Sequence, residues 1–374
     1  MPSALCPHRA LLRPPPPTFA IVASLLVHRP HPHHHNFRLS LSHAYSSHSS
    51  KSHTRPSSST QPSTTSSTST TSTSSLAHDI NPPPSTRPAD LNLPATLPKD
   101  APPASKLKRY IAVGRAYLTF YKTGLKNVYH NYRAALPLRR SLGLPVYLPS
   151  SPPPAARHAA AFRKSLLSSD LSRSQFQLLR RSAYDVRRMI PFALILIVCG
   201  EMTPLAVLAL GNAVTPLTCR VPRQLEKERI KRSVRKRDAL VPVGSVTAPT
   251  VGSDAEMSAL RRMADPEWIR DADDHAVLRA CAALGLAKTH TRPTWWVGLI
   301  YRPRLNRYAE YLDLDDGLIR SCGGVSRMEA SEVRMAVEER GRVGVGLTGG
   351  EDGWEVEREE RRWLEKWLAA RERK

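Results

Sequence analysis

Apolar residues recur at helical spacing in the first ordered part of the chain. Over residues 107–132 they return every three or four positions, and Lys and Arg fill the positions between them. This pattern predicts a basic amphipathic helix, or two helices broken near Gly124, ending before Pro137. The helix either lies on an anionic bilayer or packs on the rest of the protein with a solvated basic face. Another helix is predicted over residues 155–168, and Ser172 is placed to cap the one after it.

The next segment is almost free of charge. Residues 189–219 contain a single charged residue, and the apolar run Ile190–Leu210 would be about 32 Å long as a helix. That length matches the hydrocarbon core of a bilayer, about 30 Å thick. Basic residues flank both ends of the run, as is typical of a membrane span. We predict a single transmembrane helix over residues 189–211; the alternative is a buried helix of a soluble core.

Three residues of this span carry its special chemistry. Pro191 suits the first turn of the helix, and Pro204 is expected to kink its interior. Glu201 lies near the middle, where a carboxylate is costly and is expected to be neutral at rest. It is a candidate for proton or cation coupling, or it hydrogen-bonds backbone freed by Pro204 or a partner helix.

A strongly basic segment follows the span, within a region predicted to run over residues 212–253 and to end as a plain linker. The excess of positive charge on this side indicates that the C-terminal side faces inward, which in a mitochondrion is the matrix. The basic run is a candidate for binding ribosomal RNA or lipid head groups, or it is a charged helix face. Its nine basic residues are Arg220, Arg223, Lys227, Arg229, Lys231, Arg232, Arg235, Lys236 and Arg237.

Residues 254–374 are predicted to form an all-α domain. Its signals for the beginning and end of helices are Asp265-Pro266, Asp273 or Asp274, Gly285, the capping box Ser326–Glu329, and Gly341. A last helix over residues 356–371 places four large apolar side chains on one face, those of Trp363, Leu364, Trp367 and Leu368.

No motif in this domain predicts enzyme chemistry. Asp313, Asp315 and Asp316 lack the spacing of a calcium loop and are interpreted as helix caps. The glycine-rich residues 344–350 lack a P-loop lysine and are interpreted as a flexible loop. No nucleophile is paired with a base, and the dispersed cysteines form no metal-ligand pattern. We therefore expect no enzyme activity, no metal and no cofactor.

The N-terminal quarter has a different composition. The first acidic residue is Asp79, six basic residues precede it, and Ser and Thr dominate residues 46–75. This composition predicts a mitochondrial presequence over residues 1–45 and a disordered linker over residues 46–103. A secretory signal built on residues 19–27 is the rival. A histidine cluster at residues 28–53 has metal-binding composition but falls within the predicted presequence and linker.

Charge narrows the class of partner. The formal net charge of +23 indicates a polyanionic partner such as RNA, a ribosome or an anionic membrane face. Five widely separated cysteines in a chain of 374 residues exclude a disulfide scaffold.

Two blocks of sequence resemble the LETM family of mitochondrial inner-membrane proteins. Residues 171–210 are similar to the family's membrane segment, including Asp185, Ile190-Pro191-Phe192, Glu201 and Pro204. Residues 273–286 and 311–341 resemble its ribosome-binding domain through Leu284-Gly285-Leu286, Asp315-Asp316, Ile319, Gly324-Val325 and Arg340-Gly341. The chain departs from the pattern at Gly323, where the family usually has Glu, and we expect no counterpart of the family's coiled-coil and EF-hand region.

The resemblance implies a 14-3-3-like helical matrix domain that docks mitochondrial ribosomes at the inner membrane and supports membrane-protein biogenesis. It also implies a role in cation homeostasis, with potassium (or calcium)/proton exchange through Glu201 in an oligomer as the alternative function. The expected partners are the mitochondrial ribosome, inner-membrane lipids and a second copy of the chain, and no DNA. Calcium sensing by EF-hands is not expected.

Overall fold

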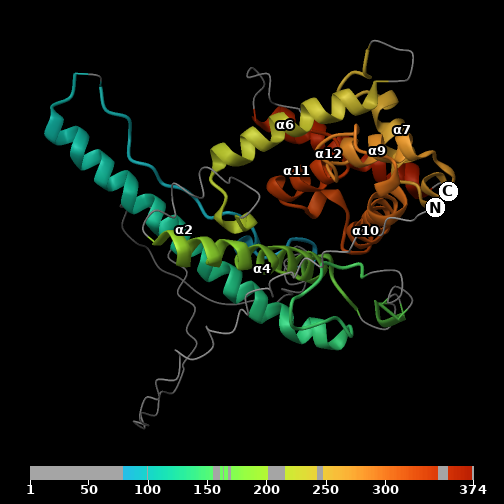
Figure 1. The fold of residues 1–374 in the computed structure, drawn as a ribbon, viewed down its shortest axis with the longest axis horizontal. Helices are drawn as coiled ribbons and strands as arrows, with labels where there is room; N and C mark the ends of the chain where they lie inside the picture. The colour runs from blue at the N-terminus through green and yellow to red at the C-terminus, as the bar shows by residue number, and fades with distance from the viewer. Residues whose placement is uncertain are drawn as a thin grey trace, which may run out of the picture. The chain divides into compact units, whose positions relative to one another are not determined.

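The computed structural model describes residues 79–98, 100–154, 161–162, 164–166, 170–200, 215–241, 247–343 and 353–372. Every regular element in these ranges is helical, and they contain no strand, which confirms the all-α prediction (Figure 1). No helix within these ranges is both long and apolar enough to cross a membrane. The predicted presequence, most of the Ser/Thr-rich linker, Glu201, Pro204 and the glycine-rich loop at 344–350 lie outside the described residues.

Two long helices, α2 (Pro103–Ser141) and α4 (Arg173–Cys199), pack against each other and run antiparallel (Figure 1). Of the two alternatives, the single helix is observed, since α2 passes through Gly124; its expected end before Pro137 is wrong, because the helix continues to Ser141. Gly124 is instead a packing glycine, because a Cβ there would lie 2.7 Å from Cys219 Sγ. Ser172 does begin α4, since its Oγ accepts a hydrogen bond from Gln175 N at 3.3 Å.

Part of the predicted linker is ordered. Residues 79–98 include the short η1 (Pro84–Thr86) and run beside α2, where Asn131 Nδ2 donates to Ser85 O at 2.8 Å. Ile80 is fully buried in the main core. The linker prediction was therefore too long at its C-terminal end, because composition alone did not register these few anchoring residues.

The C-terminal helices form the rest of the core. The elements in chain order are η4 (Leu217–Cys219), α6 (Pro222–Leu240), α7 (Asp254–Met263), α8 (Pro266–Asp271), α9 (Asp274–Ala283), the π-helical η5 (Val297–Tyr301), α10 (Arg302–Ser321), η6 (Val325–Arg327), α11 (Ala330–Glu339) and α12 (Gly353–Glu372). Helix α6 packs along α9, and α11 packs on α12. The four apolar residues predicted on one face of the last helix are all buried.

Most predicted helix ends are confirmed. Asp265 caps α8 through Glu267 N, and Asp273 caps α9 through the backbone N–H groups of residues 275 and 276. Gly285 and Gly341 follow α9 and α11 with φ angles of +74° and +94°. The capping box at Ser326 is wrong, because α11 begins only at Ala330.

Contacts from residues 79–98 account for the late start of α11. Glu329 N donates to Asn81 Oδ1 at 2.8 Å, and Arg87 Nη2 lies 2.6 Å from Glu329 Oε2. Residues far away in the sequence therefore satisfy the start of α11, and residues 325–327 form the 3-10 turn η6 instead.

Candidate anion-binding surface

Helix α6 contains the basic segment and has two different faces. It begins at Pro222, after Val221, whose N–H donates to the side chain of Gln224 at 3.2 Å. The apolar residues Ala239 and Leu240 at its C-terminal end are buried. Because α6 is straight helical backbone, cations spaced by three, four or seven residues fall on the same side.

The inner face of α6 binds acidic residues of the C-terminal helices. Lys236 Nζ lies 2.7 Å from Glu256 Oε1 and donates to Val343 O at 2.8 Å, and both ionic side chains are almost fully buried. Burial lowers the pKa of Lys236 from its usual value, although Glu256 opposes the shift. Arg229 Nε lies 2.6 Å from Glu338 Oε1, and Arg232 donates to the Glu338 carbonyl at 3.0 Å. These three predicted anion-binding residues therefore hold α6 to α7 and α11.

Two further basic residues are engaged locally. Arg220 Nη2 donates to the Tyr184 hydroxyl at 2.5 Å, which ties the start of the basic segment to α4. Arg235 Nη2 lies 2.7 Å from Glu228 Oε1 on the same helix.

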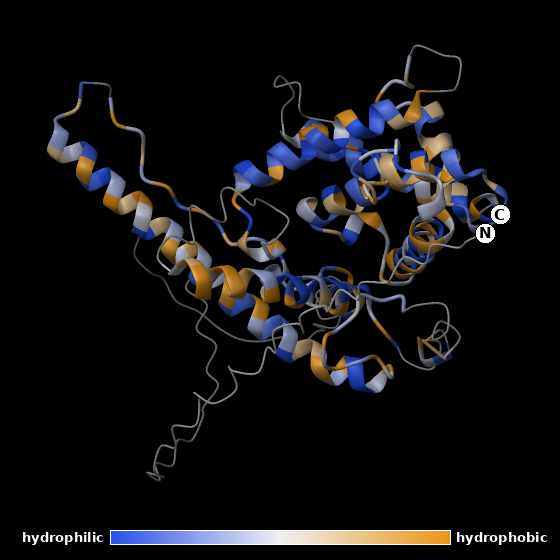
Figure 2. Ribbon diagram, viewed as in Figure 1, coloured by the Kyte–Doolittle hydropathy of each residue, from blue (hydrophilic) through white to orange (hydrophobic). Residues whose placement is uncertain are grey.

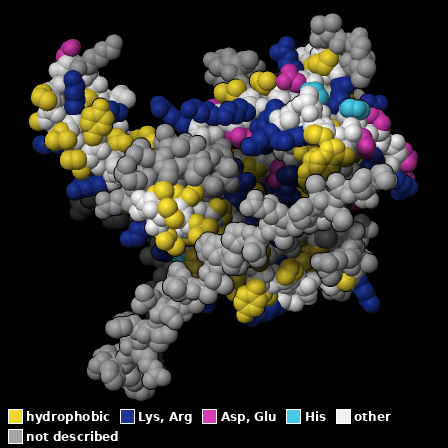
Figure 3. Space-filling model, viewed as in Figure 1, with side chains coloured by type: hydrophobic (Ala, Val, Ile, Leu, Met, Phe, Trp, Pro, Cys, Tyr) yellow, Lys and Arg dark blue, Asp and Glu magenta, His cyan; other side chains and the backbone are white. Residues whose placement is uncertain are grey.

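The outer face keeps the remaining four cations in solvent. Their side chains are exposed, and the intervening Ile230 and Val234 are about half exposed, at 47% and 53%. Figure 3 shows dark blue side chains along this helix. The four residues are Arg223, Lys227, Lys231 and Arg237, and we call them the outer cation row.

The sequence could have separated these two faces. The inner positions 225, 229, 232, 236 and 239 recur at three or four residues, and so do the outer positions 223, 227, 231 and 234. High charge on both faces concealed the period, because a hydrophobicity pattern cannot distinguish a buried, paired Lys236 from an exposed Lys231.

A second charged cluster was missed entirely. Asp315 and Asp316 were expected to be helix caps, and this expectation is wrong, because both lie buried inside α10. Asp315 accepts hydrogen bonds from Arg173 Nε at 3.0 Å, Gln177 Nε2 at 2.8 Å and Arg340 Nη2 at 2.9 Å. Burial acts to raise the pKa of Asp315, but Arg173 and Arg340 hold it well below its usual range.

The same cluster extends from α10 to α11 and α12. Asp316 pairs with Arg340 and accepts from Trp367 Nε1 at 3.1 Å. Arg181 of α4 holds Glu332 of α11 through two hydrogen bonds of 2.8 Å. The buried ionic cluster thus joins the beginning of α4 to three helices of the C-terminal region. Its function is structural, since every ion in it faces a partner and none opens to solvent.

The predicted membrane residues are only partly described. Pro191 lies inside α4, which runs unbroken from Arg173, so it does not occupy a first turn as expected. Figure 2 shows that the hydrophobic colouring of α4 increases towards its C-terminal end. Exposed Leu194, Ile197 and Val198 lie there, at 58%, 79% and 82%.

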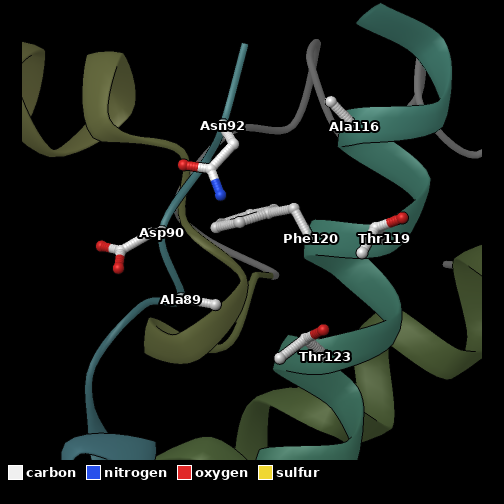
Figure 4. Close-up of a pocket in the computed structure, with 7 residues that line it drawn as sticks. All are labelled: Ala89, Asp90, Asn92, Ala116, Thr119, Phe120 and Thr123. Atoms are coloured by element: carbon white, nitrogen blue, oxygen red, sulfur yellow. The ribbon is translucent and has the colours of Figure 1, made fainter. Parts of the chain in front are cut away.

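A depression beside α2 is lined mainly by uncharged residues. Phe120 extends from α2 towards Asn92 of the facing segment, and Asp90 is the one ionisable residue among its seven lining residues (Figure 4). Among the described residues, no group of three or more His, Cys, Asp or Glu side chains is arranged to hold a metal. We therefore place the candidate site on α6.

Comparisons with known proteins identify no relative of this chain. No known protein family, no curated protein and no solved structure matches the chain.

Proposed function

We propose that this chain is a membrane-attached ribosome-binding protein of the mitochondrial matrix face, of the type that the LETM resemblance implies. The outer cation row of α6 would contact ribosomal RNA phosphates, while the inner face fixes the helix on the domain. The apolar segment that starts within α4 would attach the protein to the inner membrane.

The observation that carries this proposal is the division of α6. Four cations remain solvated on a helix whose other cations are bound by Glu228, Glu256 and Glu338. Solvated cations fixed on a rigid helix suit phosphate binding, because their ordering cost is met by folding and each contact releases counterions. Exchange through Glu201 gains no support here, because that residue lies outside the described part of the chain.

The test is co-sedimentation of the detergent-solubilised full chain with purified mitochondrial ribosomes over a salt series. Replacing Arg223, Lys227, Lys231 and Arg237 with Gln should weaken binding at least tenfold. It should also reduce the slope of log affinity against log salt by about 3.

A matched control removes the same charge elsewhere. Replacing the exposed residues Arg262, Arg270, Arg362 and Lys366 with Gln lowers net charge equally and leaves α6 intact. Equal losses in the two variants would show that binding follows net charge alone, and the assignment to α6 would be wrong. No binding by the unaltered chain at low salt would remove the ribosome proposal.

A further inference from the structure

Residues on the two sides of the apolar segment Ile190–Leu210 contact each other. Leu217 N donates to Asp185 Oδ1 at 2.6 Å, and Arg220 donates to Tyr184. Gly124 of α2 approaches Thr218 and Cys219 so closely that it has no room for a Cβ. Residues on either side of the predicted span are therefore neighbours.

The apolar part of α4 that the structure describes is shorter than a bilayer crossing. It stops at Cys199, and Gly200 has a φ angle of +51°, which is typical of a helix end. The ten residues Ile190–Cys199 rise only about 15 Å, half of the roughly 30 Å hydrocarbon core.

Chain length excludes a straight helix that reaches Leu210 while these contacts hold. A helix continuing to Leu210 would place that residue about 37 Å from Asp185. The seven residues from there to Leu217 can extend at most about 25 Å. A straight crossing and the hydrogen bond between Asp185 and Leu217 are therefore incompatible.

Helix α2 adds a second exposed apolar group. Because α2 and α4 are antiparallel, the first half of α2 and the end of α4 point in the same direction (Figure 1). Hydrophobic side chains gather over both elements on the face shown in Figure 3. The exposed large apolar residues in the first half of α2 are Leu107, Tyr110, Ile111 and Leu118, each at least 50% exposed.

The charge of α2 indicates what covers this surface. The helix contains no acidic residue over its 39 residues. A row of exposed cations lies beside the apolar stripe, spaced seven, seven, four, seven and seven residues apart, so that they share one side of the helix. They are Lys108, Arg115, Lys122, Lys126, Arg133 and Arg140. An apolar stripe beside a cation row is the composition of a helix lying in the surface of an anionic bilayer.

We propose that the apolar surfaces of α2 and α4 are embedded in one leaflet of an anionic bilayer, with the chain entering and leaving through the same membrane surface. The inference rests on the membrane attachment proposed above and replaces the single crossing predicted from the sequence. Helix α2, the beginning of α4 and the C-terminal helices then all lie on one side. An RNA partner accounts for the cation row but not for the exposed Leu107, Ile111 and Leu118.

A double-cysteine variant distinguishes the two topologies in each molecule. Its native cysteines are replaced with Ala, and Arg140→Cys and Arg237→Cys introduce one exposed thiol before and one after the apolar segment. The protein is reconstituted into vesicles of phosphatidylcholine and cardiolipin, and a membrane-impermeant polyethylene glycol maleimide is added. Because both thiols lie on one side, each molecule should carry two labels or none, whichever way it is oriented.

A crossing would produce molecules with one label each, and that result would overturn the inference while leaving membrane attachment intact. Failure of the chain to float with vesicles would remove the attachment itself. Labelling in detergent should give two labels on every molecule and shows that both thiols react.

A second measurement tests α2 separately. A fluorophore on Leu118→Cys should be quenched by brominated acyl chains, as should one on Val198→Cys, whereas Arg237→Cys should not. Quenching at residue 198 without quenching at residue 118 would overturn the assignment of α2 to the membrane.

Discussion

The two halves of α4 have opposite surroundings. In the first half, Arg173 and Arg181 are buried and paired with Asp315 and Glu332 of distant helices. In the second half, Leu194, Ile197 and Val198 are exposed, and all three side chains are apolar. One helix therefore connects a fixed, charge-paired region to an open, apolar surface.

This difference shows how the fold can hold an apolar segment at a defined position. Exposed apolar residues alone would not fix the direction of α4. The buried pairs do so, because moving either partner would leave an unpaired charge in a water-excluded site. We expect substitutions in the paired region to affect stability, and substitutions on the open surfaces to affect binding.

The largest expected effect is at Asp315. Replacing it with Ala leaves Arg173 and Arg340 facing an empty acceptor site and should lower the free energy of unfolding by about 3–5 kcal/mol. Asp313→Ala is the matched control, since the side chain of Asp313 is 73% exposed, and it should change stability by less than about 0.5 kcal/mol. Denaturant unfolding monitored by circular dichroism measures both. Similar effects of the two variants would contradict the role of the buried cluster.

Substitutions at Lys236 and Arg235 compare a buried and a partly exposed ion pair on the same helix. Lys236→Met leaves the buried Glu256 carboxylate without its cation and should cost about 2–4 kcal/mol of stability. Arg235→Met breaks the partly exposed pair with Glu228 and an exposed hydrogen bond to the Lys231 carbonyl, and it should cost less than about 0.5 kcal/mol. Thermal unfolding of the two variants checks this, and a harmless Lys236→Met would mean that the inner face of α6 does not anchor the helix.

Asp185, at the junction of the two halves, should respond to pH in the opposite direction from the cluster. Burial raises its pKa to about 6, although Leu217 N and Arg220 act to lower it. Because the folded pKa exceeds the unfolded value near 4, ionisation of Asp185 opposes folding, and this cost grows as pH rises from about 4 to about 6. The lowered pKa values of Asp315 and Glu332 instead give stability that is present above about pH 4 and is lost as pH falls.

Comparison with Asp185→Asn isolates this residue. The stability of the unaltered chain relative to the variant should be greater at pH 4 than at pH 7, by up to about 3 kcal/mol. Denaturant midpoints across this range measure the difference. A constant difference would mean that Asp185 does not titrate with a raised pKa.

The sequence predicted the local features well and the distant pairings poorly. Ser172, Asp265, Asp273, Gly285 and Gly341 all act within one helical turn of their own position, so their identity was enough. The buried ionic cluster joins residues 142 positions apart in the case of Arg173 and Asp315, and no local pattern records such a pairing.

The candidate site was predicted in outline for the same reason. The basic run was evident from composition, but its division depended on Glu256 and Glu338, which lie outside the run. The positive φ angle of Gly200, directly after the last residue of α4, was also not predicted, because hydropathy averaged over Ile190–Leu210 does not register the backbone of a single glycine.

The smallest effect concerns the place where the chain returns to α2. In Gly124→Ala the new Cβ would lie 2.7 Å from Cys219 Sγ and 2.8 Å from Thr218 O. The Thr218 contact involves backbone, so η4 must shift, and we expect a loss of about 1–3 kcal/mol. Gly114→Ala is the control within the same helix, because a Cβ there meets nothing within 4 Å. It should stabilise α2 by about 0.5–1 kcal/mol through lower backbone entropy in the unfolded chain. Thermal unfolding should therefore shift in opposite directions for the two variants. A shift to higher temperature in both would mean that η4 does not pack tightly against α2. The contact between α2 and the residues that follow the apolar segment would then be absent.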